Sequence, residues 1–216
     1  MINQANSLEP EKHQPAMTDL PLFPLKTVLL PSNTLALKIF EPRYVDMIAR
    51  CMREDAEFGV VLIFKGGETQ HNTDIYSVGT TAKIVDWQNR ADGLLGITVL
   101  GLQRFEILST RTQTDGLTIA DIKTLSEQAA FLVPAQYAYM QELLVHLSAQ
   151  TGRLGSEQQS YSEILYQLIS LLPLASNLKQ RLLEITHCNE RAAILHAELI
   201  RIGVIQYVKP DLPEPK

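Results

Sequence analysis

The chain has 216 residues, of which 45% are hydrophobic and 20% are charged, and its formal net charge is -5. This length is enough to bury one large core or two modest ones, and the composition is ordinary for a globular protein. The acidic balance disfavours general binding to nucleic acids or anionic membranes, which usually requires a basic surface.

The cysteines and the apolar segments further limit the kinds of protein that this sequence can encode. Cys51 and Cys188 are the only cysteines, too few for a disulfide framework or a four-cysteine zinc site, so we expect both to be buried or incidental reduced thiols. The N-terminus lacks the basic start and apolar run of a signal peptide, and no segment reaches the ~20 apolar residues of a membrane span. The expected location is therefore the cytoplasm, without a membrane partner.

The first elements in chain order are a leader, two extended segments and a helix. Residues 1–19 are polar and aperiodic, so we expect a flexible leader. Prolines confine the extended residues 20–30 to an edge or to barrel-closing positions, and residues 34–40 alternate as a half-buried strand does. Pro42 lacks an N–H donor, so it ends this strand and starts a helix over residues 42–54. The apolar stripe of this helix comprises Tyr44, Met47, Ile48, Cys51 and Met52.

A series of short strands follows. Their closeness and their glycine-containing turns, such as Asp92-Gly93 and Asp115-Gly116, are typical of a small barrel or sandwich. Gly101 is expected to join two of these strands. The predicted strands are residues 59–64, 77–87, 94–100, 104–112 and 117–125.

After Pro134 the apolar residues take helical spacing, and glycine becomes sparse. We expect Asn177 and Asn189 to be the N-caps of the last two helices. The proline-rich residues 209–216 cannot continue a helix. The predicted helices are residues 135–150, 162–172, 178–186 and 189–207.

Several separated motifs, in this order, resemble the amino-terminal LON domain of the ATP-dependent Lon proteases. They are PLFPL at 21–25, IFEPRY at 39–44, VGTTAKI at 78–84, GITVLGLQRFEI at 96–107 and LLPLASNLKQRLLEITHCNERAAIL at 171–195. The resemblance covers residues 20–208.

The resemblance implies an α+β fold, with a PUA-like β-barrel that contains one short inserted helix and is followed by an α-helical bundle. The implied organisation is a leader at 1–19, a barrel domain at 20–130, a helical domain at 131–208 and a tail at 209–216. It also implies substrate recognition. The sequence contains no GxxxxGK[ST] phosphate loop and ends before a Ser–Lys peptidase domain could begin, so we expect a stand-alone, non-catalytic member.

Four residues are candidates for peptide binding, each with a structural alternative. Arg43 and Tyr44 could line a groove, or Arg43 could pair with a carboxylate or carbonyl while Tyr44 packs inward. Arg104 could contact a partner, or form an ion pair on a strand face. Trp87 is the only tryptophan; exposed, it would be a binding anchor, and buried, it would plug the barrel. No catalytic residue, metal site or cofactor is predicted, since no HExxH or GxSxG pattern occurs.

The sequence is compatible with three functions. The leading hypothesis is a protein-binding module that recognises polypeptide segments or unfolded proteins between barrel and helices, with a Lon-type protease as a candidate partner. Strand addition at a barrel edge is a suitable mechanism. The alternative is an RNA-binding PUA-like module, which requires a basic face, and the third is an enzyme whose site the sequence does not reveal.

Overall fold

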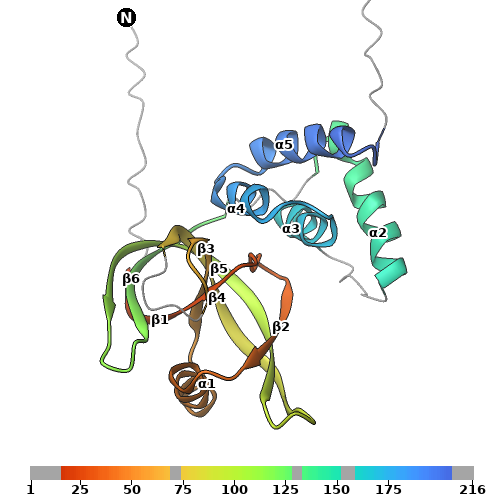
Figure 1. The fold of residues 1–216 in the computed structure, drawn as a ribbon. Coiled ribbons are helices and arrows are strands. Elements are labelled where there is room, and N and C mark those ends of the chain that lie inside the picture. Colours follow the sequence, from red (N-terminus) through yellow and green to blue (C-terminus); the bar gives the residue numbers. More distant parts are fainter. Residues whose placement is uncertain (1–15, 69–73, 128–132, 152–158, 206–216) are drawn as a thin grey trace, which may run out of the picture.

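The computed structural model describes residues 16–68, 74–127, 133–151 and 159–205. Some of the expected leader and all of the expected tail lie outside these ranges. Within them, six strands and five α-helices form an α+β fold (Figure 1).

The strands pair into a sheet that closes on itself. In the order β2-β5-β4-β3-β1-β6, the additional pairing of β5 with β6 completes a ring of five strands and leaves β2 outside it. All of these pairings are antiparallel except that between β1 and β3. The strands are β1 (Ala16–Leu25), β2 (Thr34–Ile39), β3 (Phe58–Lys65), β4 (Asp74–Asn89), β5 (Leu95–Thr112) and β6 (Thr118–Leu125).

Two strand predictions need correction. The two strands expected on either side of Gly101 are the single long strand β5, and β1 starts at Ala16 instead of residue 20. Gly101 does not make a turn. A Cβ atom at this position would lie 2.4 Å from the Leu30 carbonyl oxygen, so glycine is needed where the β1–β2 loop crosses the strand.

Helix α1 (Pro42–Glu54) has the predicted bounds and begins with the predicted proline. Met47, Ile48 and Cys51 of its apolar stripe are buried against one face of the sheet, where Phe58 and Val99 also lie. Met52, which the predicted stripe included, is exposed. A smaller core, which includes Phe105, is built from residues of β1, β3, β5 and β6. The pattern of the sequence therefore placed this helix correctly, because its interface is built from its own stripe.

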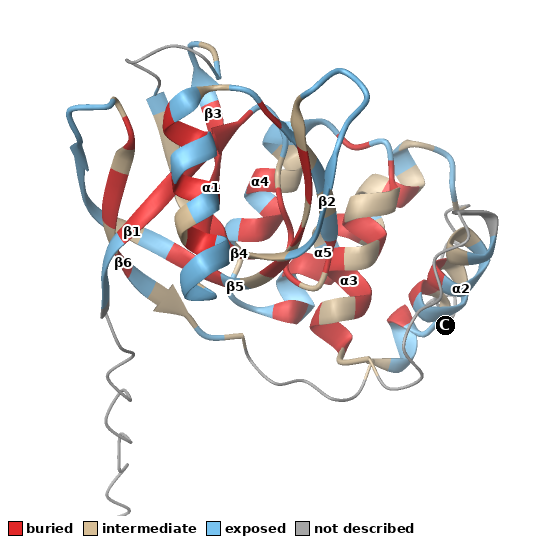
Figure 2. Cartoon of the chain, turned by 90° about the horizontal axis from the view of Figure 1, so that it is seen from below, coloured by how far each residue is buried: buried red, intermediate tan, exposed pale blue. Residues whose placement is uncertain are grey.

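The C-terminal helices share a core of their own. They are the 3-10 turn η1 (Ala135–Tyr137), α2 (Tyr139–Thr151), α3 (Tyr161–Leu171), α4 (Ser176–Glu184) and α5 (Cys188–Arg201). Leu30, from the β1–β2 loop, is buried in this helical core. Helices α3, α4 and α5 lie on the side of the sheet away from α1, and α2 is outermost (Figures 1 and 2).

The predicted N-caps were wrong. Helices α4 and α5 begin one residue before Asn177 and Asn189, so Ala175 and His187 occupy the cap positions and neither makes a side-chain cap. The capping box belongs to α3, where Ser160 and Glu163 bond each other's backbone N–H groups.

Candidate functional site

Arg43 and Tyr44 are buried at the junction of α1 with the sheet. The Arg43 side chain donates hydrogen bonds to the Glu41 carboxylate at 3.0 Å and to the Gly116 carbonyl oxygen at 2.8 Å. The Tyr44 ring packs 4.3 Å from that of Phe23, and burial raises the pKa of Tyr44 to about 12. The structural interpretation of this pair is confirmed: both residues fix α1 to the sheet.

Arg104 lies on β5 and is only 1% exposed. It forms the expected ion pair, with Glu127 as its partner. Its Nη1 also donates to the carbonyl oxygens of Leu183 at 2.9 Å and Ile185 at 3.2 Å, at the end of α4. Arg104 therefore joins the strand ring to the helices.

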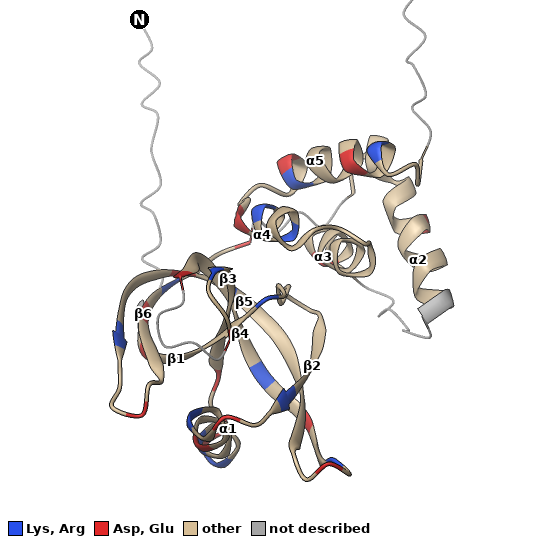
Figure 3. Cartoon of the chain, viewed as in Figure 1, with Lys and Arg blue, Asp and Glu red and all other residues tan. Residues whose placement is uncertain are grey.

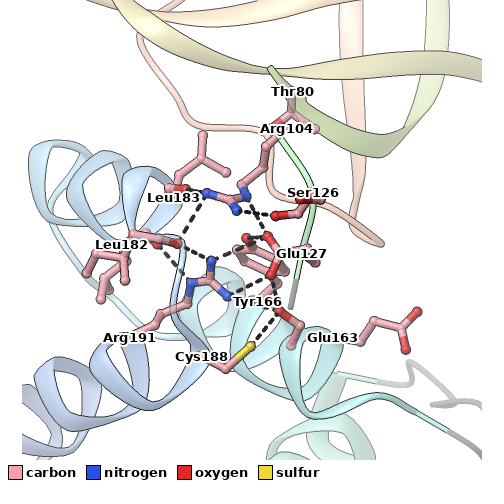
Figure 4. Close-up of polar contacts among 12 residues, drawn as sticks. Thr80, Arg104, Ser126, Glu127, Glu163, Tyr166, Leu182, Leu183, Cys188 and Arg191 are labelled. Carbon is pink, nitrogen blue, oxygen red and sulfur yellow. Dashed lines mark hydrogen bonds and ion pairs between the residues drawn. The ribbon is translucent and has the colours of Figure 1, made fainter. Parts of the chain in front are cut away.

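A second arginine completes this cluster from the opposite side (Figure 4). Arg191 on α5 is fully buried and forms an ion pair with Glu127 at 3.3 Å. It donates to the carbonyl oxygens of Leu182 at 3.0 Å and Ile185 at 2.5 Å. Glu127 thus lies between two arginines that come from different halves of the chain.

The electrostatics of Glu127 favour its ionised form. Burial alone would raise its pKa, but this effect is outweighed by Arg191, by hydrogen bonds from Ser162 and Tyr166, and by Arg104, so that the pKa of Glu127 is lowered. Removing one partner of a buried ion pair leaves an uncompensated charge and is strongly destabilising. The cluster is consequently a structural joint.

Sequence reasoning missed Glu127 and Arg191. One signal was present: on α5, Arg191 follows Cys188 by three residues and precedes Leu195 by four, so it falls within the buried stripe of the helix. A charged residue in such a stripe indicates a buried partner. Nothing in the sequence around Glu127 identifies it as that partner.

Trp87 is 54% exposed and lies near the end of β4, where Val85 is 52% exposed. Of the four candidate residues it alone offers a large apolar surface. Arg43 and Tyr44 are neighbours in the first turn of α1. Arg104 lies where β5 meets the helices, and Trp87 lies towards the β4–β5 hairpin. The structure therefore brings together only the first two, and the four do not form a common surface.

A cleft of about 680 Å³ lies between β5 and the N-terminal half of α3. Its α3 wall carries Gln167, whose side chain accepts a hydrogen bond from Gln159 at 3.0 Å. Gln103 comes from β5, and Ser32 donates to the Glu163 carboxylate at 3.2 Å across the cleft. Side-chain amides and hydroxyls of this kind can pair with peptide N–H and C=O groups.

The described ranges provide little for metal or nucleophilic chemistry. Within them, no group of three or more histidine, cysteine or acidic residues is placed to bind a metal ion. Both cysteines are buried thiols, and burial raises the pKa of the Cys51 thiol. His196 makes a 2.6 Å contact with the Tyr139 hydroxyl through Nδ1.

Charges of both signs are distributed over the same elements (Figure 3). On the strand ring, for example, Lys83 pairs with Asp55 and Arg111 pairs with Asp19. In the described part of the chain, this mixed pattern differs from the basic face that RNA binding requires. No helix in the described part of the chain is long and apolar enough to cross a membrane.

Comparison with known proteins gives the chain its family. Residues 19–201 match the family model described as "ATP-dependent protease La (LON) substrate-binding domain". The crystal structure of a Lon N-terminal domain protein from Xanthomonas campestris is similar with a TM-score of 0.71 and 28% identity, over 84% of this chain and 98% of that one. The N-terminal domain of a Mycobacterium avium complex Lon protease, at 16% identity and a TM-score of 0.61 over 88% and 100% of the two chains, shares the fold.

Among curated proteins, Lon protease of Bacillus thuringiensis is 27% identical over 80% of this chain and 23% of its own length. Protein cereblon of Xenopus tropicalis is 31% identical over 50% of this chain and 24% of its own length. The chain thus spans about a quarter of the length of these relatives. Because one family model covers both the strand ring and the helices, the chain belongs to the family of LON substrate-binding domains.

Proposed function

We propose that this protein is a non-catalytic recognition module that binds polypeptide segments in the cleft between β5 and α3. The observation that carries the proposal is the cleft itself, in which amide side chains from a strand and a helix face a space of about 680 Å³. A space of this size matches those that proteins use for specific ligands. The family description as a substrate-binding domain supports the same role.

We further infer that the ring of five strands is the PUA-like barrel and that α2 to α5 form the helical bundle that the resemblance implies. In this arrangement the Arg104–Glu127–Arg191 cluster fixes the distance between the two cleft walls. A cytoplasmic location and an adaptor role beside a Lon-type protease are part of the same proposal.

The test is a titration of the full chain with a reduced and alkylated, hence unfolded, protein, followed by fluorescence anisotropy. Saturable binding is expected. Replacing Gln103 and Gln167 together by alanine should weaken it about tenfold, since each lost hydrogen bond contributes about 0.5–1.5 kcal/mol. The exposed Gln88, which lies on β4 outside the cleft, provides the control Gln88→Ala.

The outcome that contradicts the proposal is the absence of saturable binding, or equal binding by both variants. Trp87→Ala tests the remaining anchor of the sequence-based prediction: loss of binding in this variant would move the site to the β4–β5 hairpin. A steep salt dependence together with binding to single-stranded RNA would favour the alternative PUA-like RNA module.

A further inference from the structure

Strand β2 has an open edge. Its residues pair only with β5 among the described strands, because β2 lies outside the closed ring. The direction of its backbone groups follows from the ladder: Gly101 N–H donates to the Asn33 carbonyl oxygen at 2.9 Å, just before the paired register begins at Thr34. Bonded residues alternate in an antiparallel ladder. Thr34, Ala36 and Lys38 consequently direct their N–H and C=O groups away from β5.

These three residues are exposed, so the outward groups are accessible. The intervening Leu35 and Leu37 are partly buried at the margin of the core beneath α1. An added strand would therefore meet free backbone groups and, on one face, apolar side chains at alternate positions. These are the two elements of recognition by strand addition.

The edge leads into a second cavity, of about 460 Å³, at its N-terminal end. Asn33, Thr34 and Leu35 line one side of this cavity, and Ser170 and Lys179 line the other. Lys179 is the only charged residue of the lining, which contains no acid. The edge and the cavity therefore form one continuous surface with a single positive charge at its end.

Lys179 has unused hydrogen-bonding capacity. Its Nζ donates to the Ser170 carbonyl oxygen at 3.1 Å, and an ammonium group has three N–H donors. In the described part of the chain no carboxylate lies within ion-pair distance of it. Burial lowers its pKa, and no neighbouring acid offsets this effect. An incoming carboxylate would supply the missing counter-charge.

The direction of the added strand follows from this charge. A segment antiparallel to β2 brings its C-terminal end to Thr34, and hence its α-carboxylate to Lys179. A parallel segment with a free N-terminus would bring a second ammonium group there, which like-charge repulsion disfavours. Among the described strands, β4 also has an open edge over residues 83–89, but Lys83 there already pairs with Asp55 at 2.9 Å.

We propose that the open edge of β2 binds the free C-terminal segment of a polypeptide as an antiparallel strand, with its terminal carboxylate held by Lys179. The β2 edge lies outside the cleft of the proposed function, so the inference goes beyond that function and adds a second polypeptide-binding surface. The preferred ligand is an extended C-terminal tail with apolar residues at alternate positions.

The probe is an N-terminally labelled peptide of about eight alternating valine and threonine residues, enough to span the strand. The full chain is titrated with this peptide as the free acid and as the C-terminal amide. The amide should bind at least about tenfold more weakly. In Lys179→Met this difference should disappear, while Lys123→Met, at an exposed position of β6, should retain it.

A backbone readout tests the strand itself. N-methylation at alternate peptide positions should abolish binding in one register and be tolerated in the other, since only every second residue faces β2. Ala36→Pro, which removes one outward N–H donor, should weaken binding by a similar factor, and its unfolding curve shows whether the fold is intact.

The outcomes separate this inference from the proposed function. Equal affinity of acid and amide, or insensitivity to the register of methylation, overturns the inference. If the unfolded protein still binds through Gln103 and Gln167, the proposed function stands without it. If neither the peptide nor the unfolded protein binds, both fall.

Discussion

The sheet is covered on two sides, and the two sides are held by different chemistry. On one side, α1 buries an apolar stripe from a single stretch of 13 residues. On the other side, the joint between strands and helices contains Glu127 between Arg104 and Arg191. The first contact is tolerant, because apolar packing is non-directional. The second contact is specific, because Glu127 must meet Arg104 and Arg191, which lie far from it in the sequence.

The largest expected effect is on the charged side. Glu127→Ala should lower the free energy of unfolding by about 3–5 kcal/mol, since it leaves two buried guanidinium groups without their shared carboxylate. Urea unfolding followed by circular dichroism measures this. Glu106→Ala, at an exposed position of β5, should change stability by less than about 0.5 kcal/mol. Similar values for the two variants would show that the cluster contributes little.

On the apolar side, Ile48→Ala should cost about 3 kcal/mol, because Ile48 is fully buried and its truncation leaves a cavity. Val45→Ala, on the exposed face of the same helix, is the matched control and should stay near wild type. Unlike Glu127→Ala, neither substitution should alter the nuclear magnetic resonance signals of Tyr161 and Tyr166. A change there would mean that the two sides are coupled.

The stability contributions of the two sides should also differ in their dependence on pH. The pKa of Glu127 is lower in the folded protein, so its stabilisation is complete above the unfolded-state pKa of about 4.3 and is lost as the pH falls through the folded-state value. The difference in melting temperature between wild type and Glu127→Gln should therefore shrink as the pH is lowered from neutral to about 3. The deficit of Ile48→Ala should remain constant over this range. A Glu127→Gln deficit that is independent of pH would contradict the assigned charge.

The smallest effect is expected at the start of α3. Ser160→Ala removes the hydroxyl of the capping box and should lower the free energy of unfolding by about 1 kcal/mol. Ser160→Thr keeps a capping oxygen and should restore most of it. Chemical denaturation resolves the difference, and an alanine variant as stable as wild type would exclude a contribution from this cap.

The apolar side of the sheet was easier to predict from the sequence than the charged side. The bounds of α1 could be predicted, because helical periodicity is a local signal. The burial of Tyr44 and the ion pair of Arg104 were each one of two alternatives that the sequence left open. The family could be identified from IFEPRY and VGTTAKI. Glu127 and Arg191 could not be found, since their pairing depends on contacts across 64 sequence positions. The continuity of β5 through Gly101 depended on a crossing loop that no local pattern reports.

The arginine cluster also bears on whether the helical half could exist by itself. Helix α4 has nine residues, fewer than an isolated helix needs for stability in water. Its terminal carbonyl groups, which have no partners within the helix, are satisfied by Arg191 from α5 and by Arg104 from the strand ring. The hydrogen bonds at the end of α4 are therefore complete only when β5 is folded, because Arg104 lies on that strand. We expect the strand ring and the helices to unfold in one cooperative step, and the boundary near residue 130 to separate two architectures but not two autonomous folding units.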